Sequence, residues 1–337
     1  MILPVTPRNF AENRRTPMSH SAQLGTASVS VDLDPLRCYH EIHALPPAEP
    51  RLQSVILRRA LPRFLDVFAR HRIRATFFVV GSDLIATDDA ESRALLQRAV
   101  AEGHELGNHS HNHLYDLARL PRHRIEREIG DCHQALLDLT GKPPVGFRGP
   151  GYEVSGTLFD VLEAFGYRYD SSIFPCPPYY LAKAAILAKM TLLRQPSGAI
   201  LGSPWALPAP TQPYRPHSRQ PFRRGSSPVL EIPIGVTPLL RLPAIGTSLL
   251  LPTPLLSGAM RALILRGMQR QPFFNFELHG MDLLGADEDE VPEPLRSRQP
   301  DLRTPLAQRL ATLDDLLAAL TRRRRLLPLA ELAQSYT

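Results

Sequence analysis

The feature that most constrains this chain is the alternation of strand-like and helix-like segments along most of its length. Short apolar, β-branched runs predict strands at 27–33, 74–81, 104–110, 145–152, 167–172, 229–234, 273–278 and 325–329. Helical spacing of apolar residues predicts helices between them at 53–71, 90–102, 121–139, 155–165, 254–268 and 304–321. Strands that are separated by helices indicate parallel βαβ units. The sequence therefore predicts an α/β fold with a parallel sheet or barrel.

The 337 residues are enough for one large domain or two ordinary ones. We expect a flexible lead-in at residues 1–25 and a single domain at 26–332. The stretch 175–228 interrupts the alternation, is rich in proline, serine and arginine, and contains an apolar helix candidate at 179–193. Because it is too long for a plain connection, we interpret it as an insertion that covers one face of the sheet.

Composition and charge exclude several classes of protein. The net charge is +6, but only three of the 39 basic residues are lysines and the positive charges are dispersed, so nucleic-acid binding is not expected. Three cysteines without a CxxC pair fit a reducing compartment. The N-terminal residues lack the basic-then-apolar order of a signal peptide, and no run approaches the ~20 apolar residues of a membrane span. We therefore expect a cytoplasmic location.

Two polar clusters lie where strands are expected to end. Asp32 and Asp34 are two apart at the end of the first strand, so both carboxylates can face one site. His109 and His113 are spaced i, i+4, which in a helical turn places both imidazoles on one side, within reach of one cation. Two histidines and a carboxylate make a three-ligand metal site with open positions, and the second carboxylate is free to act as a base. This combination predicts metal-assisted hydrolysis.

With these residues in view, the sequence resembles the NodB-homology polysaccharide deacetylases, carbohydrate esterase family 4. Motifs occur in the family's order over about residues 26–332: Asp32-Leu33-Asp34, His109-Ser110 with His113, Arg148-Gly149-Pro150-Gly151-Tyr152, Asp170-Ser171-Ser172 and Leu278-His279. The resemblance implies a distorted (β/α) barrel of the NodB-homology type with a long insertion. It also implies a divalent metal cofactor, for which we expect Zn²⁺, with Co²⁺, Ni²⁺ or Mn²⁺ as alternatives.

The resemblance assigns a role to each motif residue. It implies that Asp32 is the catalytic base, held by Arg148, and that His279 is the general acid that protonates the departing amine. Asp34, His109 and His113 are then the metal ligands. The implied substrate-binding residues are Pro150, Gly151, Tyr152 and Asp170.

The chain departs from the family pattern at several places. Tyr152 follows a second glycine instead of the proline, and the usual tryptophan after Asp170 is absent. Glu277 occupies a position that is usually apolar, where it either orients an inward-facing group or points outward. Asp282 is an alternative partner for His279.

The expected reaction is removal of an N-acyl group, most simply N-acetyl, from a sugar-like or lipid-linked sugar substrate. The lipid link and a peripheral membrane contact are suggested by the apolar stretches 179–193 and 249–256, which alternatively pack in the core. Other functions considered are deformylation of a polyprenyl-linked amino sugar and a non-catalytic carbohydrate- or lipid-binding module of the same fold. A non-haem iron oxygenase fits less well. In its usual arrangement a His-x-Asp motif precedes a distant histidine, whereas in this chain a distant aspartate precedes the two histidines. The oligomeric state is not predicted.

Overall fold

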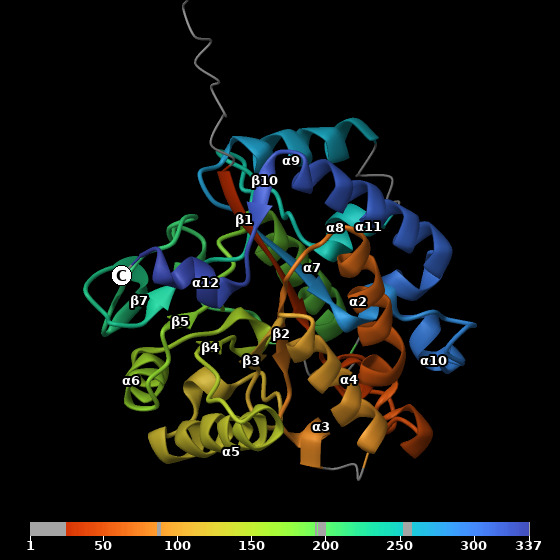
Figure 1. Ribbon diagram of the computed structural model, residues 1–337, viewed down its shortest axis with the longest axis horizontal. Helices are drawn as coiled ribbons and strands as arrows, with labels where there is room; N and C mark the ends of the chain where they lie inside the picture. Colours follow the sequence, from red (N-terminus) through yellow and green to blue (C-terminus); the bar gives the residue numbers. More distant parts are fainter. Residues whose placement is uncertain (1–24, 86–88, 193, 195–199, 252–257, 337) are drawn as a thin grey trace, which may run out of the picture.

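A parallel sheet of eight strands forms the centre of the protein in the computed structural model, which describes residues 25–85, 89–192, 194, 200–251 and 258–336 (Figure 1). The strands are β1 (Gly25–Asp32), β2 (Thr76–Val79), β3 (Glu105–Asn108), β4 (Gly146–Phe147), β5 (Tyr169–Asp170), β8 (Leu230–Glu231), β9 (Asn275–His279) and β10 (Arg324–Leu326). Their order is β10-β1-β2-β3-β4-β5-β8, and β9 also pairs with β1. All of these pairings are parallel, as the alternation of strands and helices predicts.

The sheet curls toward a barrel. The amide of Gly235, in the segment after β8, donates a 2.8 Å hydrogen bond to the carbonyl of Asn275 in β9, and Ile245 forms an isolated bridge with Glu277. These contacts bring the two edges of the sheet together without a continuous ladder. The expectation of an α/β, distorted barrel is therefore confirmed.

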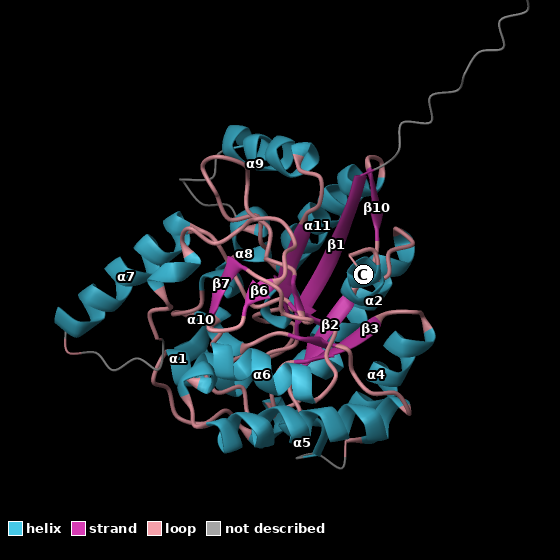
Figure 2. Ribbon diagram, turned by 90° about the vertical axis from the view of Figure 1, so that its left-hand side faces the viewer, coloured by secondary structure: helices cyan, strands magenta, loops and turns pink. Residues whose placement is uncertain are grey.

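Helices surround the sheet (Figures 1 and 2). They are α1 (Leu36–Ile42), α2 (Leu61–Arg70), α3 (Ser82–Ile85), α4 (Ala90–Ala101), α5 (Arg122–Thr140), α6 (Gly156–Ala164), α7 (Pro177–Leu192), α8 (Gly246–Leu250), α9 (Gly258–Arg270), α10 (Glu293–Arg296), α11 (Leu306–Thr321) and α12 (Leu329–Gln334). Single turns of 3-10 helix occur at Pro50–Leu52, Leu117–Arg119, Pro150–Tyr152, Pro204–Ala206, Gly280–Leu283 and Pro300–Arg303.

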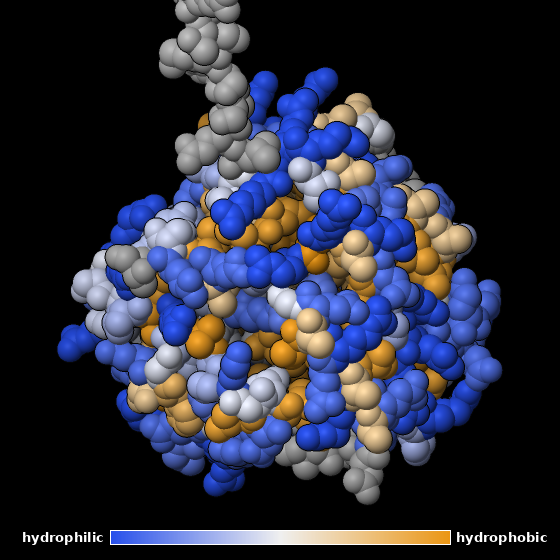
Figure 3. Space-filling model, viewed as in Figure 1, coloured by the Kyte–Doolittle hydropathy of each residue, from blue (hydrophilic) through white to orange (hydrophobic). Residues whose placement is uncertain are grey.

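The helices pack by apolar faces. In α2, Leu61, Phe64, Leu65 and Phe68 are all buried, at the i, i+3, i+4 and i+7 spacing that places them on one side of a helix. They belong to the main core, which also includes Phe77 of β2. Polar side chains cover most of the face seen in Figure 3, and apolar ones are visible mainly between them. No helix in the described part of the chain is long and apolar enough to cross a membrane.

The predicted elements are present, with differences at their ends. The segment 53–71 is not one regular helix, because a π-helical turn at Ile56–Ala60 precedes α2. The helix expected at 254–268 is observed as α9, Gly258–Arg270. The short helices α1, α8 and α12 were not predicted. The lead-in to residue 24, and residues 252–256 of the second apolar stretch, lie outside the described residues.

The segment 175–228 contains the apolar helix α7 and an antiparallel hairpin of β6 (Pro216–His217) and β7 (Gln220–Arg224). Figure 2 shows α7 at the edge of the molecule. Its inner side lines a cavity together with Asp32 and His279, the last residues of β1 and β9. These two strand ends are in register with each other, so the helix lies over the carboxyl ends of the central strands.

Candidate metal centre and active site

The three expected metal ligands meet at the carboxyl end of the sheet. Oδ1 of Asp34 lies 3.1 Å from Nε2 of His109 and 3.3 Å from Nε2 of His113. One ligand atom from each residue lies within 4.8 Å of the other two, and all three residues are buried. The two imidazole rings are 4.9 Å apart and nearly perpendicular. The sequence prediction that these residues converge therefore holds in the structure.

The hydrogen bonds around the three residues fit a cation between them. Nδ1 of His109 donates to the carbonyl oxygen of Arg148 at 2.7 Å, so the neutral ring presents an Nε2 lone pair to Asp34. Oδ1 of Asp34 is buried and accepts no hydrogen bond of good geometry among the described residues. Two lone-pair atoms in such close contact repel each other unless a proton or a metal ion lies between them. This donor set of two imidazoles and one carboxylate suits a divalent transition metal such as zinc.

Electrostatics at this centre favour an ionised carboxylate. Burial alone raises the pKa of Asp34, but His113 and His109 beside it hold that pKa well below its ordinary value. Burial lowers the pKa of His109, and the carboxylates of Asp32 and Asp34 more than offset this and raise it. The centre therefore keeps a negative charge available to a cation.

The backbone that carries the histidines is not the helical turn that the i, i+4 spacing suggested. It is a loop after β3, in which Ser110 and His113 have positive φ values of 61° and 59°. The Ser110 hydroxyl accepts from the His113 amide at 3.1 Å, and the amide of Ser110 donates to Asn108 Oδ1 at 2.8 Å. Local side-chain bonds, not helix periodicity, bring the two rings to one side.

Asp32 and Arg148 form a buried pair beside the candidate metal ligands. Nη1 of Arg148 donates to Asp32 Oδ1 at 2.6 Å, and both side chains are almost fully buried. The other guanidinium nitrogens donate to Ser30 Oγ, to Ser171 Oγ and to the Ser171 carbonyl. The second oxygen of Asp32 lies 3.8 Å from Nε2 of His109 and therefore faces the metal ligands.

His279 lies on the other side of Asp32. Its Nε2 is 3.9 Å from Asp32 Oδ2, and its side chain is partly open to the cavity. Asp282 holds His279 through the backbone, because its carboxylate accepts from the His279 amide at 2.8 Å.

Glu277 is the residue whose importance the sequence pattern left open. It is fully buried and points inward: Oε2 accepts from the Tyr152 hydroxyl at 3.1 Å, and Oε1 lies 3.5 Å from Nη1 of Arg148. Its carboxylate also lies within 4.8 Å of ligand atoms of Asp32 and His279. Burial raises the pKa of Glu277 to about 7. The signal for its orientation was present in the sequence, since Glu277 and His279 are two apart on a strand and share one face.

The expected substrate-binding residues divide into two groups. Gly151 and Tyr152 line the cavity, and the φ of Gly151 is +68°, a conformation that glycine adopts at least cost. Pro150 is buried and is absent from the cavity lining. Asp170 is fully buried, and its carboxylate accepts from the amide and hydroxyl of Ser172. This burial contradicts direct substrate binding by Asp170. Asp170 instead supports the end of β5, where the neighbouring Ser171 accepts hydrogen bonds from Arg148.

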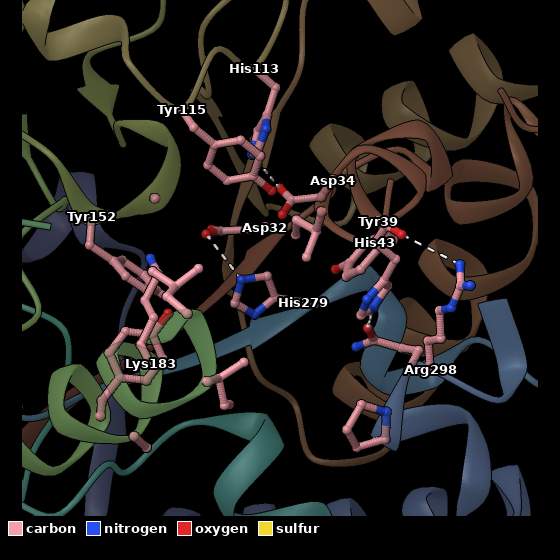
Figure 4. A pocket seen from close by; sticks show the side chains of 18 of the residues that line it. Asp32, Asp34, Tyr39, His43, His113, Tyr115, Tyr152, Lys183, His279 and Arg298 are labelled. Carbon is pink, nitrogen blue, oxygen red and sulfur yellow. Dashed lines mark hydrogen bonds and ion pairs between the residues drawn. The ribbon is translucent and has the colours of Figure 1, made fainter. Parts of the chain in front are cut away.

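The candidate active site opens into a cavity of about 580 Å³. Figure 4 shows Asp32, Asp34, His113 and His279 pointing into one space, with Lys183 and Arg298 on opposite sides of it. Tyr39, His43 and Tyr115 also line this space. Neither tyrosine belongs to an expected motif, so the sequence offered no signal for these two residues.

Comparison with known proteins agrees with this site. Residues 54–169 match the family model described as polysaccharide deacetylase. The chain is 28% identical over 123 residues to a peptidoglycan deacetylase of Helicobacter pylori, which covers 36% of this chain and 40% of that protein. It is 30% identical over 140 residues to a peptidoglycan-N-acetylglucosamine deacetylase of Listeria monocytogenes, which covers 42% of this chain and 28% of that protein. The matches thus span less than half the length of these relatives.

Solved structures extend the likeness to the whole fold. A structure from Mycobacterium smegmatis, described as a putative polysaccharide deacetylase, superposes with a TM-score of 0.57 at 15% identity, over 99% of this chain and 94% of that one. A structure from Pseudomonas aeruginosa PAO1, described as a probable polysaccharide deacetylase, gives 0.53 at 16% identity, over 92% and 90%. A Puue allantoinase gives 0.55 at 16% identity, over 99% and 98%, so the fold alone does not determine the substrate. The family match thus assigns residues 54–169 to the polysaccharide deacetylase family, and the solved structures show that the chain shares the fold of these proteins.

Proposed function

We propose that this protein is a metal-dependent hydrolase that removes an N-acyl group, most simply N-acetyl, from an amino sugar. The observation that carries the proposal is the position of Asp32. Its carboxylate is held by Arg148 at 2.6 Å on one oxygen and faces His109 at 3.8 Å with the other. A base is thus fixed beside three residues whose geometry suits a cation.

Each residue has a distinct task in this proposal. Asp34, His109 and His113 hold the divalent cation, which when bound polarises the acyl carbonyl and acidifies a water molecule. Asp32 accepts the proton of the attacking water, and Arg148 fixes its orientation. His279, 3.9 Å from Asp32, donates a proton to the nitrogen of the departing amine. Burial lowers the pKa of His279, but Glu277 and Asp32 raise it to about 9, so the ring carries this proton at neutral pH.

The alternatives are weaker on specific grounds. A non-catalytic binding module has no need for a buried acid held by arginine beside a second titratable ring, yet Asp32, Arg148 and His279 form this arrangement. An iron oxygenase does not require a general acid such as His279 beside its metal ligands. The amino sugar in the proposal is supported by the relatives named as peptidoglycan deacetylases. Deformylation requires the same residues and is separated from deacetylation only by assay.

The test is release of acetate and formate from N-acylated amino sugars by the full chain, after loading with Zn²⁺, Co²⁺, Ni²⁺ or Mn²⁺. We expect turnover with at least one metal. Asp32→Asn should lower kcat by at least about 100-fold, because it removes the general base, while metal content stays unchanged. Asp83→Asn is the control, since Asp83 lies outside the cavity. Full activity in Asp32→Asn would contradict the proposed mechanism.

A further inference from the structure

The catalytic cavity has an apolar side that removal of an acyl group from a sugar does not explain. Asp32 and His279 lie at its polar end, whereas α7 lines the cavity with Ile186, Leu187 and Met190. An acetamido group and a sugar ring present mainly polar atoms. Three adjacent aliphatic side chains therefore suit a part of the substrate other than the sugar.

The aliphatic residues of α7 are not part of the protein core. Tyr180 is the buried residue among those described in this helix, while 59% of Ile186 and 70% of Leu181 are exposed. Covering exposed apolar groups of this size with another apolar surface lowers the free energy. Because Ile186 is both exposed and part of the cavity lining, a ligand that enters the cavity can supply that surface.

A second cavity adjoins the first along the same helix. It measures about 470 Å³ and shares Tyr179 and Ala182 of α7 with the catalytic cavity. Its lining includes Pro243 and Ile245, from the segment that precedes α8. This second cavity lies toward the N-terminal end of α7, away from Ile186 and Met190, and His279 lines both cavities.

Building on the proposed function, we propose that the substrate is an N-acyl amino sugar that carries a hydrocarbon chain, and that this chain lies against α7. The acylamide is then placed at Asp32 and His279, and the chain contacts Ile186, Leu187 and Met190. Each methylene that moves from water into such a site favours binding by a factor of about four. The α7 contacts therefore select amphipathic substrates over free sugars.

The experiment compares the methyl and octyl glycosides of N-acetylglucosamine, with the octyl glycoside kept below its micelle concentration. We expect the metal-loaded protein to give a kcat/KM for acetate release at least about tenfold higher with the octyl compound. Ile186→Ser and Met190→Ser should reduce this ratio toward one, mainly by lowering kcat/KM for the octyl glycoside. Leu181→Ser is the matched control, because Leu181 lies on the same helix but does not line the cavity. It should keep the wild-type ratio.

Binding is measured separately, so that a failure of the reaction is distinguished from a failure of this inference. Calorimetry of both glycosides with the metal-loaded Asp32→Asn variant should show tighter binding of the octyl compound even if neither is hydrolysed. Equal affinity and equal kcat/KM for the two glycosides would overturn the inference and leave the proposed hydrolysis intact. A dimer that dissociates in Ile186→Ser, with no octyl preference, would assign this face to a second copy of the chain. The wild-type protein could instead bind lipid vesicles, and both Ile186→Ser and Leu181→Ser could weaken this binding equally. That result, without a preference for the octyl glycoside, would assign this face of α7 to a lipid bilayer.

Discussion

The guanidinium of Arg148 donates from Nη1 to Oδ1 of Asp32 at 2.6 Å, and both side chains are buried at the carboxyl end of the sheet. Removing one partner of a buried ion pair leaves the other charge without compensation, which costs about 3–5 kcal/mol of folding free energy. We therefore expect Arg148→Met to lower the free energy of unfolding by roughly that amount in urea titrations, and to abolish turnover. Arg122→Met is the control. Arg122 forms an exposed pair with Glu126, so its loss should cost about 0.5 kcal/mol or less.

Loss of either candidate imidazole ligand should release the metal. His113→Ala leaves His109 and Asp34, a site with two protein ligands, and bound metal measured by elemental analysis should fall to a small fraction of the wild-type content. His111→Ala is a matched control, because His111 lies in the same loop but does not line the catalytic cavity. It should retain the metal. A His113→Ala protein with one metal ion per chain would contradict the assignment of His113 as a ligand.

A chelator provides a second check that does not depend on activity. A ligand that binds only the folded state stabilises it, so removal of a bound cation should lower the Tm of the wild-type protein. The same treatment should leave the Tm of His113→Ala unchanged, since that variant has no cation to lose. An equal decrease in both proteins would indicate that the chelator acts elsewhere.

The strand ends and their chemistry were predictable from the sequence because both depend on short-range patterns. The apolar run that ends in Asp32 predicts a buried strand, and parallel strands bring their carboxyl ends to one edge of the sheet. The same argument places His109 after β3 and His279 at the end of β9. The convergence of Asp34, His109 and His113 was therefore predictable, and their role as metal ligands stays a prediction.

Features that depend on long-range packing were not predictable. The i, i+4 spacing of His109 and His113 is compatible with a helical turn, and spacing alone does not reveal that Ser110 and Asn108 form local bonds with the backbone of this loop. Asp170 lies in a matching motif, but its buried orientation follows from the packing of β5 between β4 and β8. The position of α7 over the cavity depends on how a long insertion folds back onto the strand ends, which no local pattern specifies.

Tyr152 should affect the site through Glu277. Its hydroxyl donates to Oε2 of Glu277 at 3.1 Å, and Glu277 is fully buried. Tyr152→Phe leaves that carboxylate oxygen without this donor, and we expect the free energy of unfolding to fall by about 1–3 kcal/mol. In the Glu277→Leu background, where no carboxylate needs the donor, Tyr152→Phe should have a much smaller effect. Equal costs in both backgrounds would show that the hydroxyl and the carboxylate are not coupled.

The pH dependence of activity should reveal the influence of Glu277 on His279. Burial lowers the pKa of His279, but Glu277, followed by Asp32, raises it to about 9. As a general acid, His279 must be protonated, so activity is present below this pKa and is lost as the pH rises through it. A cation at the Asp34 site repels the imidazolium, so in the metal-loaded enzyme the alkaline limb of kcat should lie below pH 9.

Glu277→Gln removes the negative charge that contributes most to raising this pKa and keeps the shape of the side chain. We therefore expect the alkaline limb of the kcat profile to move to lower pH, with metal content unchanged. Glu105→Gln is the matched control: Glu105 is the first residue of β3, at the opposite end of the sheet, where it accepts from Thr76 and Tyr169. Its neutralisation should not move the limb. If Glu277→Gln reduces kcat equally at every pH, Glu277 acts by packing alone, and the charge that keeps His279 protonated must come from Asp32.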